Sequence, residues 1–162
     1  MLRSLALEAM GEQQDEPSRS PLSDLLSGTF EELLPDRSEL DPESVKRLVL
    51  CSGKVAIDAE TERDKRGAPV AIARVEQLYP WPFDAVAAEL ARYPNADEIV
   101  WLQEEPENMG PWNAIKGRLY ERHEKSHTIR RVSRFESGSP ACGSAKVHAQ
   151  EHAELLDMAL SV

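Results

Sequence analysis

Cysteines and long apolar runs are scarce in this sequence of 162 residues, and its 19 basic residues are outnumbered by 29 acidic ones. Its two cysteines are too few for a disulfide framework, and neither lies in a Cys-x-x-Cys or Cys/His spacing that binds zinc. No apolar run approaches the roughly 20 residues that cross a bilayer. The net charge of −10 repels phosphodiester backbones and anionic membranes. We therefore expect a soluble protein with no nucleic-acid or membrane partner.

The first residues also lack the features of a targeting signal. Arg3 is followed closely by Glu8 and Glu12, which a basic transit peptide avoids, and no apolar stretch precedes a small-residue cleavage site. A reducing compartment suits a protein with so few cysteines. These observations predict a cytoplasmic protein.

Common catalytic and nucleotide-binding motifs are absent as well. There is no Gly-x-Gly-x-x-Gly, no phosphate-binding Gly-x-x-x-x-Gly-Lys, no Gly-x-Ser-x-Gly and no His-Glu-x-x-His. His148 and His152, one helical turn apart, could share a metal, but the glutamates beside them favour a solvated face. Cys51 ends an apolar run and is interpreted as a small core residue, not a nucleophile. We expect no catalytic, cofactor-binding or metal-binding residue.

Short β-branched runs alternate with helical stretches from residue 44 onward. Strands are expected at residues 45–51, 70–75, 98–102 and 128–133. Helices are expected at residues 54–66, 84–92 and 112–125 and after residue 144. This alternation predicts an α/β fold with three αβα layers around a mostly parallel sheet. On the last helix, Val147, Leu155, Leu156 and Ala159 are expected to face inward.

The sequence divides into an N-terminal arm and linker, residues 1–43, and an α/β domain, residues 44–162. Residues 11–23 are too polar to offset their ordering entropy by burial, which predicts a partly disordered arm. A short helix is expected at residues 25–34, and an acidic linker at residues 35–42.

Two polar segments follow expected strands, at the sheet edge where open α/β folds bind ligands. The Ser52-Gly53-Lys54 turn could hold a phosphate or carboxylate, although a plain turn with Ser52 as the helix N-cap explains the same residues. Glu104 and Glu105 are neighbours at a strand end and point in different directions, so paired acid/base catalysis is disfavoured. One of them is expected to face a partner surface.

Three tryptophans flank the same loops. Trp81 and Trp112 are expected to contribute to an interdomain contact surface, whereas for Trp101 core packing is an equally good interpretation.

Four segments, in order, resemble the decarboxylating component of 2-oxoglutarate dehydrogenase. Residues 48–55 resemble its Leu-Cys-Ser-Gly-Lys-Val segment, and residues 70–82 its Val-Ala-Ile-x-Arg-x-Glu-Gln-Leu-x-Pro-x-Pro segment. Residues 103–112 are similar to Gln-Glu-Glu-Pro-x-Asn-x-Gly-x-Trp, and residues 139–144 to Ser-Pro-Ala-x-Gly. The resemblance spans roughly residues 21–160 and implies the family's transketolase-like C-terminal domain.

The resemblance implies an oxidoreductase of the tricarboxylic acid cycle that decarboxylates 2-oxoglutarate and transfers succinyl to lipoamide. In that family thiamine diphosphate and Mg²⁺ bind to other domains, and the Gly-Asp-Gly signature for the metal is absent here, so the isolated chain is expected to be inactive. The implied partners are the remaining domains of the dehydrogenase, a second copy in a homodimer and the succinyltransferase core. A non-enzymatic α/β dimerisation or regulatory module is the open alternative.

Some members of the family also bind a nucleotide or acetyl-coenzyme A near this domain. If such a site exists here, we expect it at the carboxyl edge of the sheet, formed by Arg3, Ser52, Lys54 and Gln103. The first three residues resemble the end of a Ser-Leu-Leu-Arg segment that precedes the domain in the family. A truncated gene, a partial sequence and a split subunit all explain this start.

Overall fold

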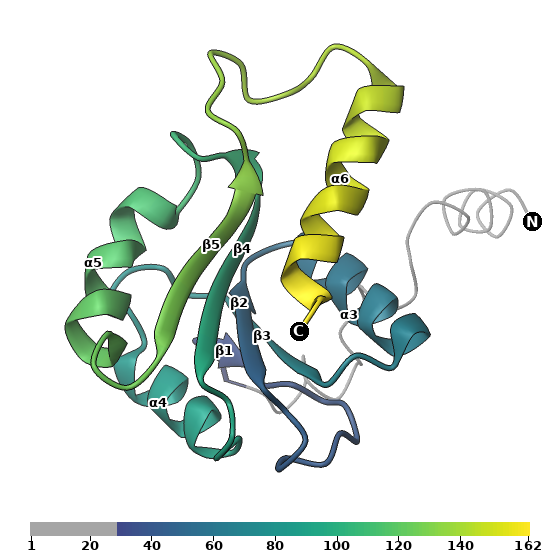
Figure 1. Cartoon of the computed structure of the whole chain (residues 1–162). Coiled ribbons are helices and arrows are strands. Elements are labelled where there is room, and N and C mark those ends of the chain that lie inside the picture. The colour runs from purple at the N-terminus through teal and green to yellow at the C-terminus, as the bar shows by residue number, and fades with distance from the viewer. Residues whose placement is uncertain (1–28) are drawn as a thin grey trace, which may run out of the picture. The chain divides into compact units, whose positions relative to one another are not determined.

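The computed structural model describes residues 29–162, and Glu31–Val162 form one compact unit within it (Figure 1). Arg3 and the expected disordered arm lie outside the described residues. The strands are β1 (Leu33–Leu34), β2 (Arg47–Cys51), β3 (Val70–Val75), β4 (Glu98–Pro106) and β5 (Thr128–Arg134). The helices are α3 (Val55–Arg66), α4 (Phe83–Ala91), α5 (Trp112–His123) and α6 (Ala145–Leu160). No helix among the described residues is long and apolar enough to span a bilayer.

The strands form one sheet in the order β1-β3-β2-β4-β5, parallel except for β1. Strand β2 lies at its centre, with Val49 between Ile72 of β3 and Val100 of β4, and all five of its residues are buried. A strand covered on both faces needs a continuous apolar run, and residues 48–51 provide one.

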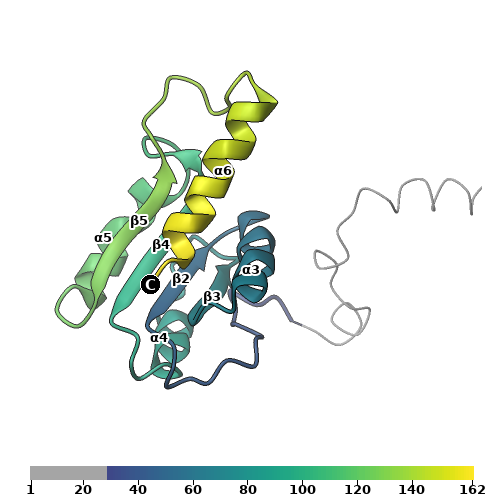
Figure 2. The same ribbon diagram turned by 45° about the vertical axis from the view of Figure 1, so that its right-hand side comes forward.

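Two apolar cores, one on each face of the sheet, confirm the expected three layers (Figures 1 and 2). Leu48 and Leu50 of β2 face α4 and α5, whereas Val49 and Cys51 face α3 and α6. This division follows from the strand geometry, because successive side chains point to opposite faces.

Two expectations about the ends of the chain are wrong. The described part of the expected helix at residues 25–34 contains β1 instead, where Leu33 pairs with Val75 and Leu34 with Arg74. These pairs provide hydrogen-bond partners for backbone groups at the outer edge of β3. Helix propensity reflects only neighbouring residues and does not include such a distant partner. Val147 is 45% exposed, because α6 packs against the sheet mainly through its second half, where Leu155, Leu156 and Ala159 are buried as expected.

The expected acidic linker contains a buried carboxylate. Asp36 accepts a hydrogen bond of 2.5 Å from the backbone N–H of Ile72, two positions before the Arg74 that pairs with β1. It also forms an ion pair with Arg63 of α3, and its own N–H donates a hydrogen bond to Glu89 of α4. Asp36 therefore continues the edge pairing that β1 begins and fixes the segment to both helical layers.

Candidate functional site

The four parallel strands end at one edge of the sheet, here called the carboxyl edge. Strand β2 runs there into Ser52 and Gly53, and Gly53 has a φ of +75°, which a residue without Cβ adopts easily. Helix α3 then begins after Lys54, which is its N-cap, and no side chain caps the helix. The expectation that Ser52 is the N-cap is therefore wrong, because the Gly53 turn places Lys54 at that position.

Lys54 is exposed at this turn. Its side chain is 67% exposed, and its Nζ lies 3.9 Å from Oδ2 of Asp58, one helical turn later. An exposed pair of this kind contributes little to stability, so Lys54 can leave Asp58 at small cost.

Gln103 is buried and uses its whole side-chain amide within the chain. Its Oε1 accepts hydrogen bonds from the Trp101 indole at 3.0 Å and from the Trp112 backbone N–H at 3.1 Å. Its Nε2 donates to the carbonyls of Met109 and Pro106 at 2.8 and 3.1 Å. Gln103 thus holds the loop between β4 and α5 and has no free group for an effector.

The three tryptophans lie in the core on the α4 and α5 face. Trp81 and Trp112 are 4% and 7% exposed, and Trp81 meets the buried Trp101 edge-on, with 6.4 Å between ring centroids. Core packing therefore accounts for all three indoles in this chain. Contact between Trp81 or Trp112 and another domain stays a prediction.

Glu104 and Glu105 differ in exposure, as alternation along a strand requires. Glu105 is exposed, beside the loop that contains Gly110. Glu104 is partly buried and approaches His152 of α6. Acid/base cooperation between the two glutamates is unsupported, because their side chains lie on opposite sides of β4.

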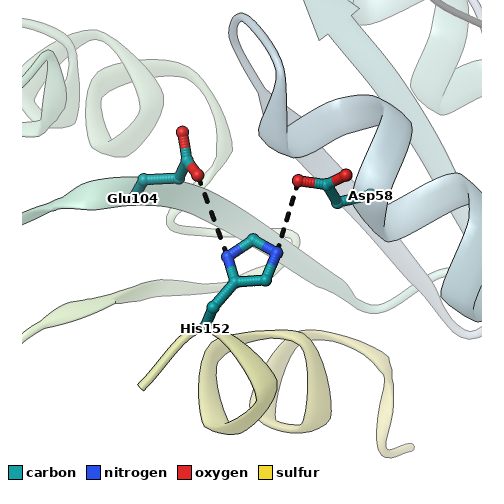
Figure 3. Close-up of side chains that lie close together, drawn as sticks. All are labelled: Asp58, Glu104 and His152. Carbon is teal, nitrogen blue, oxygen red and sulfur yellow. Dashed lines mark ion pairs between the residues drawn. The ribbon is translucent and has the colours of Figure 1, made fainter. Parts of the chain in front are cut away.

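Asp58, Glu104 and His152 form a cluster at the carboxyl edge (Figure 3). His152 places Nε2 3.3 Å from Oδ2 of Asp58 and Nδ1 3.8 Å from Oε1 of Glu104. The three residues come from α3, β4 and α6, so no local spacing in the sequence could have identified the cluster. The sequence pointed to Glu104 only as a residue that could face a partner, and to His152 only as a metal-sharing neighbour of His148. The imidazole rings of His148 and His152 do stack, with 6.1 Å between their centroids.

Cys51 lies in the core below this edge. It is fully buried, and burial, assisted by the charge of Glu60, raises the pKa of its thiol far above the ordinary range. A nucleophilic cysteine requires a lowered pKa, so Cys51 is suited only to packing.

Two exposed aromatic side chains lie in loops that leave the carboxyl edge. Tyr79 follows β3 and is 81% exposed, and Phe135 follows β5 and is 94% exposed. Phe135 also borders a surface hollow of about 220 Å³, together with Arg134, Cys142 and Glu151. The exposure of these two aromatic side chains could not be predicted from the sequence, because it depends on what surrounds each loop in the folded protein.

The chain matches known sequences over most of its length. The family model for the C-terminal domain of 2-oxoglutarate dehydrogenase matches residues 19–160. The 2-oxoglutarate dehydrogenase E1 component of Cupriavidus necator is 43% identical over 143 residues, and that of Azotobacter vinelandii is 42% identical over 147 residues.

Both alignments cover 88% of this chain and only 15% and 16% of the respective relatives. The chain therefore spans about one sixth of the length of these relatives. The match of the family model over most of the sequence, together with the α/β fold, shows that the chain belongs to the 2-oxoglutarate dehydrogenase C-terminal family.

Proposed function

We propose that this domain serves as a scaffold and interface in a 2-oxoglutarate dehydrogenase E1 component. In this proposal the parent enzyme decarboxylates 2-oxoglutarate on thiamine diphosphate and passes the succinyl group to lipoamide in the tricarboxylic acid cycle. The partners are the remaining domains of the enzyme, a second copy in a homodimer and the succinyltransferase core, in the cytoplasm. The proposal rests on the family match of residues 19–160.

The described residues do not fit thiamine diphosphate and its Mg²⁺. The surface hollow beside Phe135 contains one cation, Arg134, and two carboxylates, Glu136 and Glu151, which oppose a diphosphate. The His/carboxylate cluster at Asp58 opens on no enclosed cavity among those described. We therefore assign cofactor binding to other domains of the parent enzyme and derive no catalytic step from this chain.

The exposed aromatics at the carboxyl edge support the interface role. Tyr79 and Phe135 leave most of their rings in water, which costs hydrophobic free energy that a partner surface would recover. Both lie in loops at the same edge, since β3 and β5 run parallel. We propose that this edge contacts the remainder of the enzyme.

A complementation experiment tests the proposal. The chain is mixed with a 2-oxoglutarate dehydrogenase E1 preparation that lacks this domain, and decarboxylation and dimerisation are measured. We expect the chain alone to be inactive and the mixture to regain both properties. Turnover by the chain alone, or a mixture that regains neither property, would contradict the proposal.

Variants then locate the interface. Phe135→Ser and Tyr79→Ser should each weaken complementation about tenfold while leaving the thermal midpoint nearly unchanged, because both side chains are exposed. Met158→Ser is the matched control: Met158 is 45% exposed and lies at the opposite end of the sheet, where its carbonyl accepts a hydrogen bond from Arg47. Equal loss in all three variants would remove the carboxyl edge from the interface.

Binding of an anionic effector is a second proposed role, favoured by the N-terminus of α3. This helix has no side-chain cap, and Lys54 beside it is exposed. Of the residues expected to bind an effector, Ser52 and Lys54 lie at this turn, whereas Gln103 is occupied within the chain. Acetyl-coenzyme A is titrated into the chain and its Lys54→Ala variant, and unchanged affinity in the variant would remove Lys54 from the site.

A further inference from the structure

Three potential metal ligands from distant parts of the chain meet at the carboxyl edge. Asp58 lies in the first turn of α3, Glu104 near the end of β4 and His152 in the middle of α6. One ligand atom from each lies within 4.8 Å of the others (Figure 3). All three side chains are partly buried, with 24%, 37% and 23% of their surfaces exposed.

The imidazole of His152 has no hydrogen-bond partner within residues 29–162. Each of its ring nitrogens instead faces a carboxylate oxygen, at 3.3 Å on the Asp58 side and 3.8 Å on the Glu104 side. A partly buried imidazole that makes no hydrogen bond to the protein leaves a ring nitrogen that can bind a metal. The arrangement therefore brings one imidazole and two carboxylates together without a hydrogen bond among them.

We propose that Asp58, Glu104 and His152 bind a divalent transition-metal ion of the Zn²⁺ type. Imidazole nitrogen and carboxylate oxygen are both ligands of zinc, and three protein ligands leave a fourth position for water. Magnesium, which prefers oxygen ligands alone, suits the set less well. The inference does not depend on the proposed role in a dehydrogenase.

The distance between His152 and Asp58 agrees with this assignment. Zinc bonds of about 2.0 Å in a tetrahedron separate neighbouring ligand atoms by roughly 3.3 Å. Nε2 of His152 and Oδ2 of Asp58 already lie 3.3 Å apart. Glu104 faces the other ring nitrogen and must turn its carboxylate toward the metal, which its partly exposed side chain permits.

Lys54 is a competing cation beside the site. Its Nζ lies 3.9 Å from the same Asp58 oxygen that faces His152. A bound metal ion displaces Lys54 into solvent, because ammonium and metal repel each other and 67% of the lysine side chain is already exposed. This arrangement predicts opposite effects for removing a ligand and removing Lys54.

A metal ion at this position would connect three elements. Helix α6 packs through its second half, where its four buried residues lie, and its first half is largely exposed. His152 lies where the exposed part meets the packed part. Binding would therefore hold the start of α6 against α3 and β4.

Titration of the full chain with Zn²⁺, followed by calorimetry and by the thermal midpoint, tests the inference. We expect one bound ion per chain and a midpoint that rises with Zn²⁺ concentration. Asp58→Asn, Glu104→Gln and His152→Gln should each lower Zn²⁺ affinity by at least tenfold. Lys54→Ala should raise it severalfold.

Three controls separate this site from other binding. The chain has four histidines, and the partly buried pair His123 and His127 could bind Zn²⁺ weakly, so the double variant H123Q/H127Q must keep the high-affinity site. Glu105→Gln removes the neighbouring exposed carboxylate and must also keep it. His148→Gln should change affinity less than His152→Gln.

Clear outcomes would overturn the inference. They are the absence of a midpoint shift with Zn²⁺ in the parent chain, loss of binding in H123Q/H127Q, or unchanged affinity in both Asp58→Asn and Glu104→Gln. Circular dichroism of each variant without metal verifies the fold, so lost binding is not confused with unfolding.

Discussion

Arg63 and Asp36 form an ion pair inside the protein, with 2.5 Å between Nη1 and Oδ2 and only 5% and 1% of their side chains exposed. The pair joins α3 to the segment that follows β1. Because Asp36 also accepts the N–H of Ile72, one carboxylate connects a helix, the sheet edge and the N-terminal part of the unit.

Asp36→Ala should lower the free energy of unfolding by about 3–5 kcal/mol, because it leaves the buried Arg63 charge without its partner. Asp64→Asn is the matched control: Asp64 pairs with Nε of the same arginine, but 68% of its side chain is exposed. We expect a loss below about 1 kcal/mol for it. Urea unfolding measures both, and equal losses would contradict a special role for Asp36.

Gln103→Leu should destabilise the domain by roughly 2–4 kcal/mol, since it leaves the Trp101 indole N–H and the Trp112 backbone N–H unpaired in the core. The fluorescence spectrum should shift as the indole loses its acceptor. Gln150→Leu tests the same change on the exposed face of α6, where the amide contacts only Glu154. A neutral result for Gln103→Leu would show that the loop finds other partners.

Gly110→Ala should cost roughly 2 kcal/mol. Gly110 has a φ of +68°, and an added Cβ would lie 3.0 Å from Nε2 of Gln103 and from Oε2 of Glu105. Gly138→Ala, in a loop position with open space around it, should be nearly neutral. Thermal midpoints of the two variants distinguish strain at residue 110 from a general effect of adding a methyl group.

Gly117→Ala should raise stability by about 0.5–1 kcal/mol. Gly117 is exposed within α5, nothing lies within 4 Å of an added Cβ, and alanine loses less backbone entropy in a helix. Chemical denaturation measures the gain, and a destabilised variant would show that α5 needs this glycine for a contact outside the described residues.

The two thiols should react at very different rates. Cys142 is partly exposed, whereas burial raises the pKa of Cys51 and keeps its thiol protonated. A colorimetric disulfide reagent near pH 8 should therefore titrate one thiol quickly and the second only on unfolding. Rapid reaction of both thiols would show that β2 separates from its neighbours often enough to expose Cys51.

The same raised pKa fixes the sign of a pH effect. Above about pH 8.5 the unfolded thiol loses its proton while the folded one retains it, so stability should fall by up to about 1.4 kcal/mol per pH unit from this group. Below that pH both states are protonated and the contribution is constant. Cys51→Ala should flatten the alkaline part of the stability profile.

The layered fold was predictable because its signals are local. The apolar run of residues 48–51 can be recognised without knowledge of tertiary contacts. The same holds for Gly67, a glycine directly after a polar helical stretch, which ends α3 with a φ of +62°. The short strand β1 and the buried Asp36 were missed, because a two-residue strand has no periodicity and a buried acid resembles a linker acid in sequence.

The candidate site was predictable only in part. The turn at Ser52 and Lys54 lies at the expected sheet edge, since it follows a strand directly. The role of Gln103 could not be inferred, because its partners Met109 and Trp112 approach it only after the loop has folded. The contact between Asp58 and His152 requires two helices that lie far apart in sequence to pack side by side.

At both edges of the sheet, pairing with a strand of another chain is unfavourable, and the reason differs between the two edges. On the β3 side, β1 and the carboxylate of Asp36 occupy the backbone groups that a foreign strand would need. On the β5 side, charged side chains line the outer strand, where Arg130 and Arg131 form ion pairs with Glu98 and Glu107, and charged groups on an edge strand discourage pairing with a further strand. The domain should therefore stay dispersed when it is produced separately, without fibrils or edge-to-edge polymers.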